Sequence, residues 1–229
     1  MLFSSCVLSK EYLEPEDSLY TGIFLIEYEQ KVLNYLREAN EREVLVRAFV
    51  FPSFRPEYVV GIRKNEEEHA IFIISPMVQL WGYESLDMMK NEQVSALEDG
   101  SFVRGLDGIR ELEETYPEDY LDVPKVRCDA VIENDLANDI AALWEKMLFE
   151  TRYEKSDSLG LDGTTYHFSM TSGFQRLAGK TWSPNSQTRA GKLVALSHAM
   201  STFCEESTET NFQILEDAKI ELENALQGR

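Results

Sequence analysis

The feature that most constrains the fold is a set of three apolar runs, 44–51, 58–62 and 70–74, which are rich in β-branched and aromatic residues. Residues of these types favour strands over helices. The connectors between the runs, 52–56 and 64–68, are short, and the first contains two prolines while the second is charged. Connectors of this length join antiparallel neighbours, because a parallel return needs a crossover of a dozen residues or more. We therefore predict an antiparallel meander.

Apolar residues recur three and four positions apart in several other segments, and this spacing is typical of amphipathic helices. The segments with this pattern are 19–36, 134–152, 188–204 and 208–226. In the second of them, Ile140, Trp144 and Leu148 fall on one face, so we expect these three side chains to be buried together.

Further strands are expected at 126–132 and in a hairpin. Its first strand is 164–170, where apolar and polar residues alternate, and its returning strand is 174–182, after a turn at Ser172-Gly173. Together these patterns predict an α+β fold, with an antiparallel sheet and amphipathic helices packed against it. The length fits a single domain over 1–229, with two sub-lobes meeting near residue 123 as the alternative.

The charge balance limits the kinds of partner. The chain has 41 acidic and 22 basic residues and a formal net charge of −19. Such a field repels nucleic acids and anionic lipid surfaces, and it steers basic proteins toward the surface. The alternative interpretation is that the charge only maintains solubility. No apolar run reaches the ~18 residues of a membrane span, so we expect none.

The acids are concentrated in residues 84–122, where 12 of them face three bases. We interpret this segment as one or two surface helices with loops. Its charge is typical of a solvated face, and it is also the best candidate for a contact surface on a basic protein. The candidate partner-binding residues are Glu111, Glu113, Glu114, Glu118 and Asp119.

The opposite distribution occurs in residues 163–204, which contain no Asp or Glu, although an even spread would place about seven there. One interpretation is that this span is the packed centre of the fold, where unpaired charges are disfavoured. The other is a neutral or positive pocket for an anionic ligand or a partner side chain. The candidate pocket residues are His167, Arg176, Lys180, Trp182 and Arg189.

No motif indicates a catalytic or cofactor site. Residues 173–181 resemble a phosphate-binding loop, but five residues instead of four separate the glycines, and Trp182-Ser183-Pro184 follows where a helix should begin. We therefore reject nucleotide binding and expect no cofactor. The histidines have no metal-ligand spacing, and no Gly-x-Ser-x-Gly occurs, so we assign no catalytic residue and no metal site.

Three cysteines, Cys6, Cys128 and Cys204, are too few and too irregular for a disulfide scaffold, and they are typical of a reducing compartment. We therefore expect a cytoplasmic protein, with Cys204 acting as a small buried apolar residue. The alternative is a periplasmic lipoprotein. Residues 2–6 are similar to the end of a lipoprotein signal, and Cys6 would be its lipidated residue in a longer precursor.

Two short motifs suggest a family resemblance. The first is Asp162-Gly-Thr-Thr-Tyr-His-Phe168, and the second is Gly179-Lys-Thr-Trp-Ser-Pro184, followed by a helix. Together they resemble a loose group of small bacterial proteins, some of which look like immunity proteins that neutralise a toxin from a neighbouring cell. The resemblance covers about a quarter of the chain, and no site residue carries over from it.

The functional hypothesis is therefore a non-enzymatic binding protein, of the immunity type, that inhibits a basic partner. Two alternatives stay open: an enzyme whose site is assembled from scattered residues around 163–204, and an adaptor or lipoprotein.

Overall fold

A computed structural model of the chain describes residues 11–16, 23–65, 67–99, 113–153, 163–172 and 175–228. Six antiparallel strands form one sheet in the order β4-β3-β2-β1-β5-β6. They are β1 (Val44–Pro52), β2 (Tyr58–Asn65), β3 (Glu68–Pro76), β4 (Lys125–Ile132), β5 (Thr164–Ser172) and β6 (Gln175–Trp182). The predicted α+β class is confirmed, and so is the meander.

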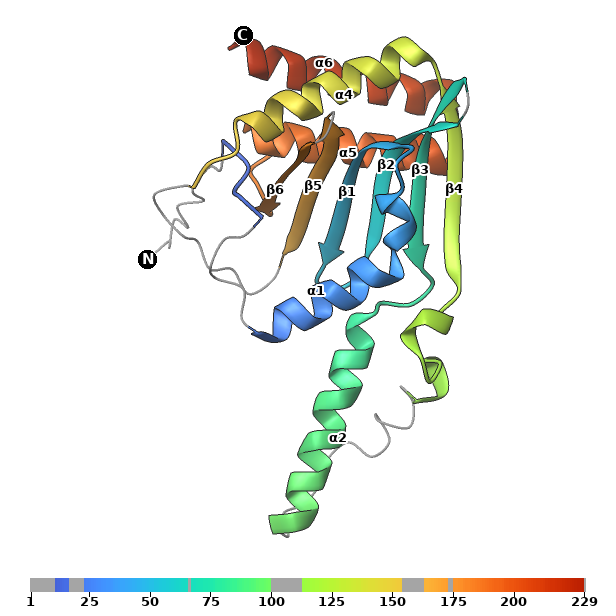
Figure 1. Ribbon diagram of the computed structural model, residues 1–229, viewed down its shortest axis with the longest axis vertical. Helices are drawn as coiled ribbons and strands as arrows, with labels where there is room; N and C mark the ends of the chain where they lie inside the picture. The colour runs from blue at the N-terminus through green and yellow to red at the C-terminus, as the bar shows by residue number, and fades with distance from the viewer. Residues whose placement is uncertain are drawn as a thin grey trace.

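Helices flank the sheet (Figure 1). They are α1 (Ile23–Tyr35), α2 (Trp81–Asp99), α4 (Asn134–Phe149), α5 (Arg189–Glu205) and α6 (Glu209–Gln227), with short 3-10 helices η1 (Arg37–Asn40) and η2 (Tyr120–Asp122). The four amphipathic patterns therefore correspond to α1, α4, α5 and α6. The first of them begins at residue 19, and residues 17–22 lie outside the described part of the chain.

Each face of the sheet has its own apolar core, and β1 contributes to both. Ala48 and Val50 pack in the core that α4, α5 and α6 cover, whereas Phe49 and Phe51 pack in the core that α1 covers. This alternation follows from the two-residue period of a strand. A strand buried on both sides needs apolar residues at nearly every position, which explains the continuous run that β1 carries in the sequence.

The prediction for α4 is confirmed, because Ile140, Trp144 and Leu148 are all buried in the larger core. α5 is more enclosed, with nine of its residues buried between the sheet and α6. Strands from both sides of residue 123 belong to the same sheet. None of the described helices combines the length and apolar character that a bilayer span requires.

The interpretation of Cys204 as only a small buried apolar residue needs correction. Cys204 at the end of α5 is buried, as expected, but it forms a disulfide with Cys128 of β4, with the two Cα atoms 5.9 Å apart. The pair is 76 residues apart in sequence, and it meets because α5 packs against β3 and β4. The spacing of the cysteines could not reveal this pairing, since it depends on the tertiary fold.

Glu38 of η1 ties this helix to the edge strand β4. Its carboxylate accepts hydrogen bonds from Arg127 at 2.9 Å and Lys125 at 2.6 Å. The hydrogen bond from Arg127 outweighs partial burial, and with Lys125 it lowers the pKa of Glu38 to about 2.

We expect Glu38→Gln to flatten the acid limb of the stability profile. A carboxyl whose folded pKa lies below its ordinary value of 4.5 stabilises the protein above that pH, and this contribution is lost as the pH falls toward 2. Denaturant unfolding at a series of pH values checks this. Glu43→Gln, which removes an exposed carboxylate nearby, is the control. An unchanged acid limb in Glu38→Gln would contradict the assignment.

Candidate functional site

The most prominent surface feature is a projection formed by residues 81–99 and 113–122. α2 begins beside the sheet and extends away from the rest of the molecule (Figure 1). The two segments contain ten acids and a single base, Lys90, which pairs with Glu113 at 2.8 Å. We call these residues the acidic projection.

A buried carboxylate anchors the projection at its base. Glu57, in the connector between β1 and β2, is fully buried and accepts hydrogen bonds from the backbone N–H groups of Leu80 at 2.8 Å and Trp81 at 3.2 Å. The first N–H groups of a helix have no partner within the helix, and a negative charge beside them interacts favourably with the helix dipole. Tyr28 of α1 donates a further hydrogen bond to the same carboxylate. Burial raises the pKa of Glu57, and these hydrogen bonds oppose the rise.

Further contacts hold the first turns of α2. Lys31 of α1 pairs with the buried Glu84 at 2.5 Å. The Tyr116 ring packs so closely on Gly82 that a Cβ there would overlap it, and the Tyr116 hydroxyl donates to the Gln79 carbonyl at 3.0 Å. The base of the projection is therefore fixed to α1 and the sheet, which sets its direction.

The acids predicted from the sequence lie beside this base. Glu113, Glu114, Glu118 and Asp119 are all exposed. Asp119 also accepts a hydrogen bond from the N–H of Leu121 at 2.9 Å, and so caps η2. Glu111 lies outside the described residues.

The five candidate pocket residues are distributed over separate places. His167 and Arg176 meet at Glu16, where Arg176 forms two hydrogen bonds of 2.9 and 3.1 Å and His167 Nδ1 lies 3.8 Å from the carboxylate. Lys180 exchanges backbone hydrogen bonds with Glu14, and Arg189 pairs with Glu150 at 2.8 Å. Trp182 lies against Gly163.

Strand geometry explains why His167 lies apart from the cleft that the structure shows. His167 pairs with Phe49 in the register of β5 and β1 and contacts the Phe51 ring, on the face covered by α1. Its neighbour Tyr166 points to the opposite face. Lys180 lies within β6 rather than at the start of a helix, which agrees with the rejection of a phosphate-binding loop.

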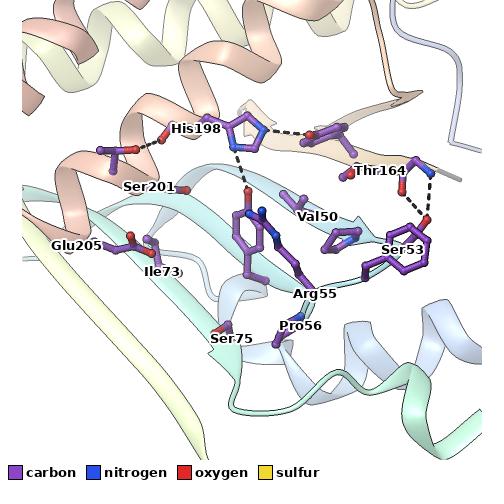
Figure 2. A pocket seen from close by; sticks show the side chains of 16 residues that line it. Val50, Ser53, Arg55, Pro56, Ile73, Ser75, Thr164, His198, Ser201 and Glu205 are labelled. Atoms are coloured by element: carbon purple, nitrogen blue, oxygen red, sulfur yellow. Dashed lines mark hydrogen bonds between the residues drawn. The ribbon is translucent and has the colours of Figure 1, made fainter.

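An open cleft of about 750 Å³ lies on the Tyr166 side. The β1–β2 connector, the start of β5, the end of β3 and the C-terminal half of α5 line it (Figure 2). Two tyrosines, Tyr58 and Tyr166, both pair with Val50 from opposite sides in the sheet register. From α5, His198 and Glu205 lie seven residues apart, on one face of the helix above them.

Both tyrosine hydroxyls contact the same imidazole. The Tyr166 hydroxyl lies 3.0 Å from His198 Nε2, and the Tyr58 hydroxyl lies 3.4 Å from Nδ1 (Figure 2). Burial and, secondarily, the charge of Arg55 lower the pKa of His198, although the residue keeps an exposed edge. The lowered pKa favours the neutral imidazole at pH 7. Burial also raises the pKa of both phenols, so they stay protonated.

None of the five candidate pocket residues lines the cleft, and the sequence analysis missed its central residues. Tyr166 and His198 lie within the acid-free span 163–204, whereas Tyr58 comes from the meander. A second acid-free stretch, 44–56, forms much of the remaining wall. Two stretches without acids were therefore visible in the sequence, but only the fold shows that they meet at one cleft.

Within the described residues, no group of three or more His, Cys, Asp or Glu side chains is arranged to hold a metal ion. No protein-family model, curated protein or solved structure matches the chain. The function of this protein must therefore be inferred from its own geometry and charge.

Proposed function

We propose that this chain is a non-enzymatic binding protein that engages a basic protein partner through the acidic projection, as an immunity-type inhibitor. The observation that supports this most directly is a projecting helix, anchored at its base, that carries ten acids and one base together with residues 113–122. A surface of one charge accelerates encounter with an oppositely charged protein and disfavours wrong partners.

Two further features support a binding role. The buried contacts of Glu57 and Glu84 fix the base of α2 before any partner arrives, and preorganisation reduces the entropy lost on binding. Met88, Met89 and Leu121 are exposed among the acids. Methionine is enriched in protein interfaces, where an apolar centre is surrounded by a polar rim.

The disulfide bears on the compartment. Bonds such as Cys128–Cys204 persist in oxidising compartments and are rare in the cytosol. This favours the periplasmic alternative over a cytoplasmic location. Cys6, the residue that would be lipidated, lies outside the described residues.

Reversing Glu113, Glu114 and Glu118 to Lys together should slow association with the partner about tenfold or more at low salt, because steering scales with the opposing charge. The effect should shrink as added salt screens it. Folding should stay intact, since each exposed change costs under about 0.5 kcal/mol. The partner is first captured from the source cell with the intact chain, and association rates are then measured at two ionic strengths.

A matched control separates local charge from net charge. Reversing Glu209, Asp217 and Glu223 to Lys changes the net charge equally, but these residues lie on α6, at the opposite end of the molecule from α2 (Figure 1). Their reversal should change the association rate far less. An acidic partner, or equal slowing by both triple variants, would reject the projection as the contact surface. The enzyme alternative stays a prediction, and the cleft at His198 is where its site would lie.

A further inference from the structure

The cleft contains a cation that has no partner in the described part of the chain. Arg55, near the tip of the β1–β2 connector, is exposed and forms no hydrogen bond or ion pair with any described residue. Several other cations have carboxylate partners: Lys31, Arg63, Lys125, Arg127, Arg176 and Arg189. Arg37 and Arg42 pair with no described carboxylate either, but they do not line the cleft, which distinguishes Arg55 from them. An arginine without a partner, among 41 acids, is available to an external anion.

Arg55 lies close to the tyrosines and the histidine. Its side chain extends into the cleft toward His198 (Figure 2). Burial is the largest influence on both neighbours: it lowers the pKa of His198 and raises the pKa of Tyr58. The positive charge of Arg55 lowers the pKa of both groups by a smaller amount, which requires it to lie near them. The guanidinium and the phenols therefore face the same space.

These groups offer hydrogen-bond donors. A neutral imidazole has one N–H and one acceptor nitrogen, so of the two tyrosines that contact His198, one donates to it and the other accepts from it. In either tautomer, the imidazole does not use the hydroxyl hydrogen of the accepting tyrosine. Tyr58 also has a side-chain hydrogen bond with Ser201, and Tyr166 has one with Thr164, so a ligand would compete with these two hydroxyls for that hydrogen. A phenol O–H beside an arginine fork is a donor set that suits a carboxylate, which arginine binds in a bidentate manner.

The rest of the wall suits an apolar group. Phe54, which is 79% exposed, and Pro52 and Pro56 stand at the rim, while Val50 and Ile73 lie on the sheet below. Ligand sites typically combine such apolar walls with a few polar groups that fix orientation. Glu205 is the one acid among the described residues that line the cleft, so the local repulsion of an anion is weaker than the net charge suggests.

We propose that the cleft binds a small carboxylate with an aromatic or aliphatic body. The carboxylate lies on Arg55 and accepts a hydrogen bond from the tyrosine hydroxyl that does not donate to His198, and the body packs against Phe54, Pro56 and the Tyr58 ring. This proposal does not rest on the acidic projection and goes beyond the proposed function, because the cleft can bind a carboxylate whether or not the projection binds a basic protein.

The test uses phenylacetate as the probe, with phenylacetamide as the neutral analogue and phenethylamine as the cationic one. Each is titrated into the full chain while the ring signals of His198 are followed by NMR. Phenylacetate should shift these signals and saturate, and the amide and the amine should bind at least tenfold more weakly. Arg55→Gln should weaken phenylacetate binding about tenfold or more, because a charge-assisted hydrogen-bond pair is lost.

Two variants serve as controls. Arg37→Gln removes an exposed arginine of η1 that does not line the cleft, and it should leave binding unchanged. Glu205→Gln should leave binding unchanged or tighten it, because it removes a repelling charge. The proposal is overturned if phenylacetate does not bind, if the amide binds equally well, or if Arg55→Gln has no effect. It is also overturned if phenethylamine binds more tightly than phenylacetate and Glu205→Gln weakens that binding, since Glu205 would then be recognising an amine.

Discussion

Trp144→Ala should lower the free energy of unfolding by about 3–5 kcal/mol, the usual cost of removing a large aromatic side chain from a core. Trp144 is fully buried in α4, and its ring packs edge-on against Phe168 of β5, with the centroids 5.4 Å apart. The substitution would therefore leave a cavity between the helix and the sheet. Urea unfolding of the two proteins, followed by far-UV circular dichroism, measures the difference.

Phe149→Ala is the matched control on the same helix. Phe149 is 64% exposed, so its removal should change stability by less than about 0.5 kcal/mol. Trp144→Phe should cost much less than the alanine variant, because the Trp144 indole N–H is buried without a hydrogen-bond partner among the described residues, and removing an unsatisfied donor offsets part of the lost volume. A loss below about 1 kcal/mol in Trp144→Ala would show that the core is assigned to the wrong face of α4.

Replacing both Cys128 and Cys204 by alanine should lower the free energy of unfolding by about 4 kcal/mol. The disulfide closes a loop of 76 residues, and the chain-entropy model gives a contribution of about this size for such a loop. Unfolding of the oxidised protein should respond strongly to dithiothreitol, whereas the double variant should not respond. The variant thus controls for any other effect of the reductant.

Thiol titration of the denatured, unreduced protein provides an independent check. A chain with Cys128 and Cys204 joined has at most one reactive thiol, that of Cys6, and none if Cys6 is lipidated. Three reactive thiols in protein isolated from an oxidising compartment would show that the bond does not form there, and the argument for a periplasmic location would fail with it.

The local patterns of the sequence located the strands of the sheet and the helices α1, α4, α5 and α6, but they set no bounds for α2. The apolar run of β1 and the helical spacing of Ile140, Trp144 and Leu148 each reflect burial within a single element, and such periodicity is visible in one segment at a time. The same reasoning identified the exposed acids Glu113 and Glu118, since an acidic segment with few apolar positions is mostly exposed; Glu84, at the start of that segment, is buried.

The cleft and the disulfide could not be predicted in this way, because their residues belong to different elements. Tyr58, Tyr166 and His198 meet only when β2 and β5 align on Val50 and α5 packs above them. Glu57 shows the same limit: it looks like one acid among 41, yet its burial depends on the N-terminus of α2, 23 residues later. These groups could not be predicted because their partners are distant in the sequence, and not because the pattern around each residue is weak.

The connector 52–57 belongs to both parts of the molecule that are proposed to bind. Phe54 and Arg55 line the cleft at one end, and Glu57 caps α2 at the other. Gln79, just before α2, donates to the carbonyls of Pro52 and Ser53 at 3.3 and 3.2 Å. A ligand that moves this connector in the cleft would therefore also move the residues that cap α2. By thermodynamic linkage, a cleft ligand would change the affinity for a partner by the same factor as the partner changes the affinity for the ligand.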